Sequence, residues 1–163
     1  FQRDGGPGAI WDLMGNGGTS VPEFIGWHRF ELGWFKESEV LCLSKINQNP
    51  RSIALAPINS KASDLKFAMV PLDPTKALGI EVRRASKYDN LAPYEEGTIV
   101  YLIDVSKGDD EGIISILGKK GTTREGQTLE SLHLSEKVTY QGITIKVVSS
   151  GKSGDKIEVS STQ

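Results

Sequence analysis

From residue 40 onward the chain consists of short segments with β-branched or alternating apolar residues, each bounded by Gly, Pro, Asn, Asp or Ser. Segments of this kind are typical of strands. No helical pattern lies between them, which argues against parallel strands joined by helices. The sequence therefore predicts a mainly β fold, an antiparallel β-sandwich. The expected strands span residues 40–43, 51–55, 67–70, 79–83, 98–105, 112–117, 137–140, 143–148 and 156–159.

Local signals refine this prediction. The uninterrupted apolar segment 98–105 is expected to be a central strand. Residues 138–147 form a hairpin pattern with its turn at Gln141-Gly142. Residues 149–155 should connect to a last strand, and their sequence Lys-Ser-Gly-Asp indicates a turn rather than a phosphate-binding loop, because no helix follows it.

The N-terminal part differs in composition, because all three Trp and four of the five Phe lie within residues 1–35. We expect two parts, residues 1–36 with a short helical segment and residues 37–163 with the sandwich. Ser20 and Glu23 have the spacing of a capping box, which predicts a helix over residues 21–32 that ends at Gly33. Its apolar residues point nearly all round, so the helix should need a neighbouring surface.

Composition excludes several classes. A net charge of −2 without a basic stripe gives no reason to expect nucleic acid, and no apolar run is long enough to predict a membrane span. Cys42 is the only cysteine, which rules out an internal disulfide, and its apolar neighbours predict a buried, inert thiol. The start at Phe1, without an initiator Met or an apolar leader, suggests a processed or trimmed piece.

Several segments occur in the order found in one protease family. The first is Trp11-Asp12-Leu13-Met14-Gly15, which is followed by Leu32-Gly33-Trp34. Residues 78–84, 91–104 and 134–145 then resemble that family's later strands, with Leu102 where the family often has a His. Together they resemble the part of secreted M6-type (immune-inhibitor-A-like) zinc metalloproteases that follows the zinc-binding helix.

The resemblance implies a structural role for residues 11–15, the Met-turn, with Met14 beneath the metal and not bound to it. The alternative is a Met that fills a gap in the core. The zinc motif His-Glu-x-x-His is missing, since the only histidines are His28 and His133. Zinc would therefore belong to the parent protein only, and we expect no catalytic residue in this chain.

Two functions follow from these observations. The first is the non-catalytic C-terminal portion of an M6-like secreted metalloprotease, which packs on the upstream catalytic domain or a partner chain and shapes the access of protein or peptide substrates. The alternative is a free-standing extracellular or cell-surface interaction module without protease activity, which assembles through exposed strand edges. An autonomous enzyme that uses His28 is disfavoured, because a single histidine in the middle of a helix is more often hydrogen-bonded or partly exposed than a metal ligand.

One group of carboxylates is a candidate for calcium, which prefers six to eight oxygen ligands. It follows the expected central strand, and the alternative is an ordinary polar turn, because the spacing of an EF-hand is absent. Its members are Asp104, Asp109, Asp110 and Glu111.

Overall fold

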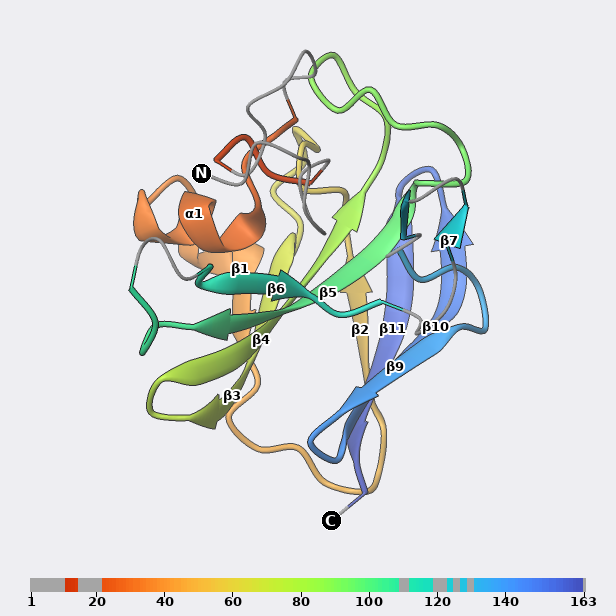
Figure 1. Ribbon diagram of the computed structural model, residues 1–163. Helices are drawn as coiled ribbons and strands as arrows, with labels where there is room; N and C mark the ends of the chain where they lie inside the picture. The colour runs from red at the N-terminus through yellow and green to blue at the C-terminus, as the bar shows by residue number, and fades with distance from the viewer. Residues whose placement is uncertain are drawn as a thin grey trace.

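The computed structural model describes residues 11–14, 22–108, 112–118, 123–124, 127–128 and 131–162. Two sheets dominate this part of the chain, and a single short α-helix, α1 (Gly26–Glu31), lies beside one of them (Figure 1). None of the helices among the described residues is long and apolar enough to cross a membrane. The predicted mainly β sandwich is confirmed.

The first sheet has five strands in the order β1-β3-β4-β5-β6. All neighbours are antiparallel except β1 and β3, which run parallel with Val40 opposite Phe67. Residues 98–105 were expected to form a central strand; β5 lies inside the sheet, between β4 and the edge strand β6, and the middle strand is β4. The strands are β1 (Val40–Cys42), β3 (Phe67–Asp73), β4 (Lys76–Arg83), β5 (Gly97–Asp104) and β6 (Ile114–Ile116).

The second sheet is antiparallel throughout, in the order β2-β11-β10-β9. Gln141 and Gly142 have φ values of 46° and 79°, as a type I′ turn between β9 and β10 requires, so the predicted hairpin is confirmed. The strands are β2 (Arg51–Leu55), β9 (Lys137–Tyr140), β10 (Ile143–Gly151) and β11 (Gly154–Ser161); a separate short pair is β7 (Thr123–Arg124) with β8 (Gln127–Thr128).

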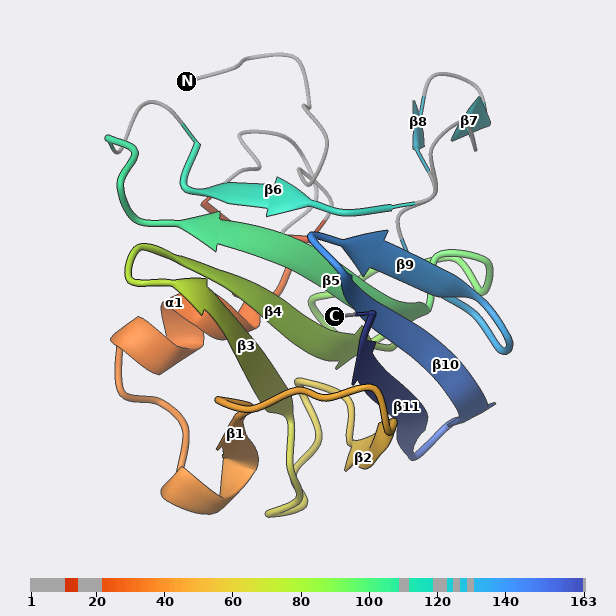
Figure 2. The same cartoon turned by 90° about the horizontal axis from the view of Figure 1, so that it is seen from below.

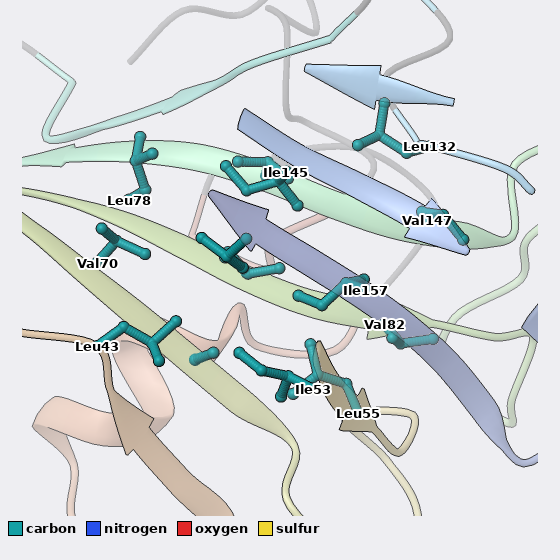
Figure 3. Close-up of a cluster of buried hydrophobic side chains, with 14 residues drawn as sticks. Leu43, Ile53, Leu55, Val70, Leu78, Val82, Leu132, Ile145, Val147 and Ile157 are labelled. Atoms are coloured by element: carbon teal, nitrogen blue, oxygen red, sulfur yellow. The ribbon is translucent and has the colours of Figure 1, made fainter. Parts of the chain in front are cut away.

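The main hydrophobic core lies between the two sheets (Figure 3). Strand β4 contributes Leu78, Ile80 and Val82, and their exposed fraction is 0%. Residues two apart on a strand lie on the same face, so this set fixes which face of the first sheet meets the second sheet. We call the opposite side of the first sheet its outer face.

The outer face has a core of its own. Seven buried residues form it, and two of them come from the N-terminal part of the chain: Trp11, Ile25, Phe67, Met69, Ile99, Tyr101 and Ile103. Figure 2 shows α1 beside β4, on the side away from β10 and β11. A short 3₁₀ helix, η1 (Glu37–Glu39), then leads into β1. The first sheet is therefore covered on both faces.

The limits of α1 differ from the prediction at one end. Residues 22–25 are not helical, and Ile25 is extended, with φ −62° and ψ 151°, so the predicted start is wrong. Ser20 and Val21 lie outside the described residues. The predicted end is confirmed: Gly33 has φ +67°, and the N–H groups of Gly33 and Trp34 bond to the carbonyls of Phe30 and Arg29.

Cys42 is exposed, and the prediction of a buried thiol is wrong. Cys42 ends β1, a strand at the edge of the first sheet, where no other strand of the described residues pairs with it. The next residue, Leu43, enters the core instead with 1% exposure. An apolar run of four residues does not indicate which member faces solvent when its strand is short and at an edge.

Candidate functional site

The outer face of β4 carries two charged side chains, Glu81 and Arg83, at positions that alternate with Ile80 and Val82 of the main core. Both have an exposed fraction of 0%. Buried charges are stable only when they are paired and hydrogen-bonded, so their partners identify what covers this face.

Arg83 is held by two carboxylates. Its Nε and Nη2 donate to the two oxygens of Asp89, both at 2.8 Å, and Nη1 donates to Oε1 of Glu81 at 2.9 Å. Burial acts to lower the pKa of Arg83, but the two neighbouring carboxylates outweigh it and the pKa is raised. The Trp11 ring lies 5.9 Å from the guanidinium carbon, within the range of a cation–π contact. We call Glu81, Arg83 and Asp89 the buried charge cluster.

The other oxygen of Glu81 binds the start of α1. Oε2 accepts the N–H of Gly26 at 2.5 Å and the hydroxyl of Tyr101 at 2.8 Å, and the same hydroxyl accepts the N–H of Trp27 at 3.2 Å. Burial, and then the charge of Glu81, raises the pKa of Tyr101 well above its ordinary value. Two backbone donors at the N-terminus of α1 are thus satisfied by side chains of the sheet.

Gly26 allows this close approach. A Cβ at this position would lie 2.6 Å from Oε2 of Glu81 and 2.7 Å from the ring of Phe67. Any larger residue would push α1 away from the sheet and lengthen the hydrogen bond to Glu81. The sequence signals for a glycine here were not distinctive, because its role depends on a strand 55 residues later.

Asp89 and Glu23 attach the residues before α1. Asp89 Oδ1 accepts the N–H of Glu23 at 2.6 Å, and Arg83 Nη2 donates to the Glu23 carbonyl at 3.3 Å. The Glu23 carboxylate, which the sequence predicted as a helix cap, instead pairs with Arg29 at 2.5 Å. Arg29 also donates to the carbonyl of Phe24. The buried charge cluster therefore joins the loop that follows β4 to the segment that precedes α1.

Residues 11–14, which we call the 11–14 turn, contact the same segment. Trp11 is 1% exposed and Asp12 is 8% exposed. Asp12 Oδ1 accepts the N–H of Ile25 at 3.3 Å, and Oδ2 lies 3.0 Å from Nδ1 of His28. The contact with Asp12 raises the pKa of His28 above 6.5, although burial of the ring opposes the shift. His28 is thus a paired, partly buried histidine, as one of the sequence interpretations expected.

The far end of α1 is exposed. Ile25 is fully buried against the sheet, whereas Phe30, Leu32 and Trp34 are 42%, 53% and 57% exposed. We call these three residues the apolar end of α1. Trp34 packs edge-on against Phe24 at 5.3 Å, and Phe30 stacks on Trp27 at 5.9 Å. The helix expected to need burial on several sides is therefore buried on one side only within the described residues.

The Met-turn residues are only partly tested by this geometry. Trp11 and Asp12 are buried, Leu13 is half-buried and Met14 is 69% exposed; Gly15 lies outside the described residues. The role of these residues beneath a metal stays a prediction. The division of the chain into two parts near residue 36 also stays a prediction, although side chains of the first sheet form hydrogen bonds with α1 across that boundary.

The calcium prediction also stays open, because Asp109, Asp110 and Glu111 lie outside the described residues. Asp104 accepts hydrogen bonds from the hydroxyl and the N–H of Ser106 and lies 3.8 Å from Nζ of Lys76. The hydroxyl of Ser106 is the main reason that the pKa of Asp104 is lowered. Among the described residues, no group of three or more His, Cys, Asp or Glu side chains could hold a metal ion.

The comparisons with known proteins add no relative. No protein-family model matches the chain, and neither a curated protein nor a solved structure does.

Proposed function

We propose that this chain is the non-catalytic C-terminal portion of an M6-like secreted metalloprotease, which packs on the catalytic domain and shapes the access of peptide substrates. The resemblance of the 11–14 turn and the later strands to that family supports the assignment. The structural observation behind it is the apolar end of α1, which is presented to solvent while the other side of α1 is fixed to the sheet.

The apolar end of α1 is exposed while the start of α1 is fixed to the sheet, and this combination favours a role in docking to another protein surface. Single exposed apolar residues are common on protein surfaces, but three within five residues, two of them aromatic, are the kind of group that protein interfaces bury. The hydrogen bonds that Glu81 and Tyr101 accept from the N–H groups of Gly26 and Trp27 hold this group in place before a partner binds. A preorganised aromatic surface loses less entropy when it docks.

In this proposal zinc belongs to the upstream domain, which would carry the His-Glu-x-x-His motif that this sequence lacks. In this proposal the chain packs on the catalytic domain and limits which substrates reach it, but contributes no group that transfers a proton or binds the metal.

Intact-mass analysis of the protein from its native source tests the proposal. We expect a longer precursor, or a co-purifying fragment that carries His-Glu-x-x-His and about one equivalent of zinc. If the native protein has only the mass of this 163-residue chain and no such fragment accompanies it, the proposal is wrong.

A matched pair of variants then tests the surface. In the native assembly, Leu32→Ser should weaken the contact with the upstream domain, measured as dissociation during size-exclusion chromatography of a proteolytically nicked sample. Leu134→Ser is the control, because Leu134 is similarly exposed at 57% but precedes β9. Equal behaviour of the two variants would exclude the apolar end of α1 as the contact.

The buried charge cluster favours a second candidate, a free-standing extracellular or cell-surface β-sandwich module. Because Arg83 and Glu81 bind the N-terminal segment through buried contacts, that segment has the character of an internal part of one fold. Such a module would use the strand edges at β6 or β9 for assembly. The same mass measurement separates the candidates, since the module would occur natively without a protease fragment.

A further inference from the structure

The carboxylate of Asp12 attaches the 11–14 turn to α1 at two points. One oxygen accepts the N–H of Ile25 at 3.3 Å, and the other lies 3.0 Å from Nδ1 of His28. Nδ1 is buried, and among the described residues its contact with Asp12 is an ion-pair distance and not a well-aligned hydrogen bond. The attraction between this carboxylate and the imidazole is therefore strongest when both ring nitrogens are protonated and the imidazole is a cation.

The surroundings of His28 favour that cation. The negative charges of Glu31 on the same helix and Glu81 on β4 raise the pKa of His28 in addition to Asp12. The Phe24 ring packs edge-on against the imidazole, with 6.5 Å between the ring centroids. The nearby cations are already paired: Arg29 with Glu23, and Arg83 with the buried charge cluster. A protonated His28 thus faces carboxylates from the turn, the helix and the sheet.

We propose that His28 is a pH-dependent latch for the 11–14 turn: the protonated imidazole holds Asp12 against the start of α1, and loss of the proton weakens that attachment. The inference goes beyond the proposed function and does not depend on which partner, if any, the chain has. The contact of the Trp11 ring with Arg83 does not involve His28, so we expect the change to be local to the contact between Asp12, Ile25 and His28.

The direction follows from linkage. The pKa of His28 is raised above 6.5 in the folded chain, so the stabilisation is complete below pH 6.5 and is lost as the pH rises through the folded-state pKa. Each unit by which the pKa of His28 differs between the attached and the detached state of the turn corresponds to a tenfold change in the opening equilibrium of the turn.

The experiment uses NMR on the whole chain. The His28 ring is titrated, and hydrogen exchange of the Ile25 amide, corrected for its intrinsic pH dependence, gives the opening equilibrium. We expect His28 to titrate above pH 6.5 and the opening constant to rise across the same pH range. The rise should be tenfold for each unit by which the measured pKa exceeds about 6.5.

Three variants sharpen the result. Asp12→Asn should return the His28 titration toward its ordinary value, and His28→Gln should remove the pH dependence of Ile25 exchange. His133→Gln is the control, because His133 lies elsewhere, 3.3 Å from Glu136, and should leave both measurements unchanged.

An unchanged His28 titration in Asp12→Asn, or Ile25 exchange in the wild-type chain that does not vary with the His28 titration, would overturn the latch. If the variants do not fold, the two wild-type measurements decide alone, since the proposal requires that they change together.

Discussion

Oε2 of Glu81 lies 2.5 Å from the backbone nitrogen of Gly26, so a strand in the sheet caps the helix that covers it. The helix has only six residues and no side-chain cap of its own. A helix this short is not stable in isolation, because its nucleation is unfavourable. The helix therefore depends on tertiary contacts, and the hydrogen bond from Gly26 to the carboxylate of Glu81 is one of them.

Replacing Glu81 should be costly. Glu81→Ala leaves the Arg83 guanidinium with one carboxylate fewer and removes the acceptor for Gly26 and Tyr101. Breaking a buried ion pair from one side typically destabilises a protein by about 3–5 kcal/mol. We expect a loss of that size in the free energy of unfolding, measured with urea. Glu37→Ala, at an exposed carboxylate, should change it by less than about 0.5 kcal/mol. Similar small losses in both variants would show that Glu81 is not a structural anchor.

Gly79 provides space for Tyr101. A Cβ at Gly79 would lie 2.3 Å from the Tyr101 ring, which is buried and stacked on Phe67 at 6.4 Å. The ring cannot yield without losing its hydrogen bond to Glu81, so Gly79→Ala should cost about 1–3 kcal/mol through overpacking. Gly151→Ala is the control, because its Cβ would find no atom nearer than 4.0 Å. Thermal unfolding of both variants checks this; an equal loss would indicate a general effect of alanine in these strands.

The ion pair between Glu39 and Lys66 predicts a pH dependence. Nζ of Lys66 donates to Glu39 Oε1 at 2.7 Å, and the Lys36 N–H donates to Oε2 at 2.9 Å. These bonds, chiefly that of Lys66, lower the pKa of Glu39 below 4.5. The stabilisation is thus complete above pH 4.5 and is lost as the pH falls through the lower, folded-state pKa. Carboxyl ¹³C NMR should show this titration, and Lys66→Gln should move it upward. No movement would mean that Lys66 does not stabilise the charged form.

The strand content was predictable because its signals are local. All nine expected segments correspond to strands, and the turn at Gln141-Gly142 follows from the two residues themselves. The parallel pairing of β1 with β3 was not predictable, since Val40 and Phe67 meet through contacts that no local pattern encodes.

The candidate site was harder to predict for the same reason. Alternation of Glu81 and Arg83 with Ile80 and Val82 is also the pattern of a strand with one solvated face. What buries the charges here is a segment about 55 residues earlier. Its sequence signals predicted a helix that is apolar on nearly all sides, but none of them identified β4 as its partner. The capping pattern of Ser20 and Glu23 misled the prediction of the helix start, because tertiary partners supply the caps. The hydrogen bond between Arg83 and Asp89 was also not predicted, because a spacing of six residues in the sequence does not indicate a contact.

The two sides of α1 should respond differently to truncation. Ile25 is fully buried in the outer-face core with Phe67 and Tyr101, so Ile25→Ala removes packed apolar volume and should cost about 2–5 kcal/mol. Leu32 is 53% exposed, so Leu32→Ala should change the free energy of unfolding by less than about 1 kcal/mol in the isolated chain. Urea unfolding of both variants measures the difference. A large loss for Leu32→Ala would mean that the apolar end of α1 is buried in the isolated chain in solution, and that it is not free to dock on a partner.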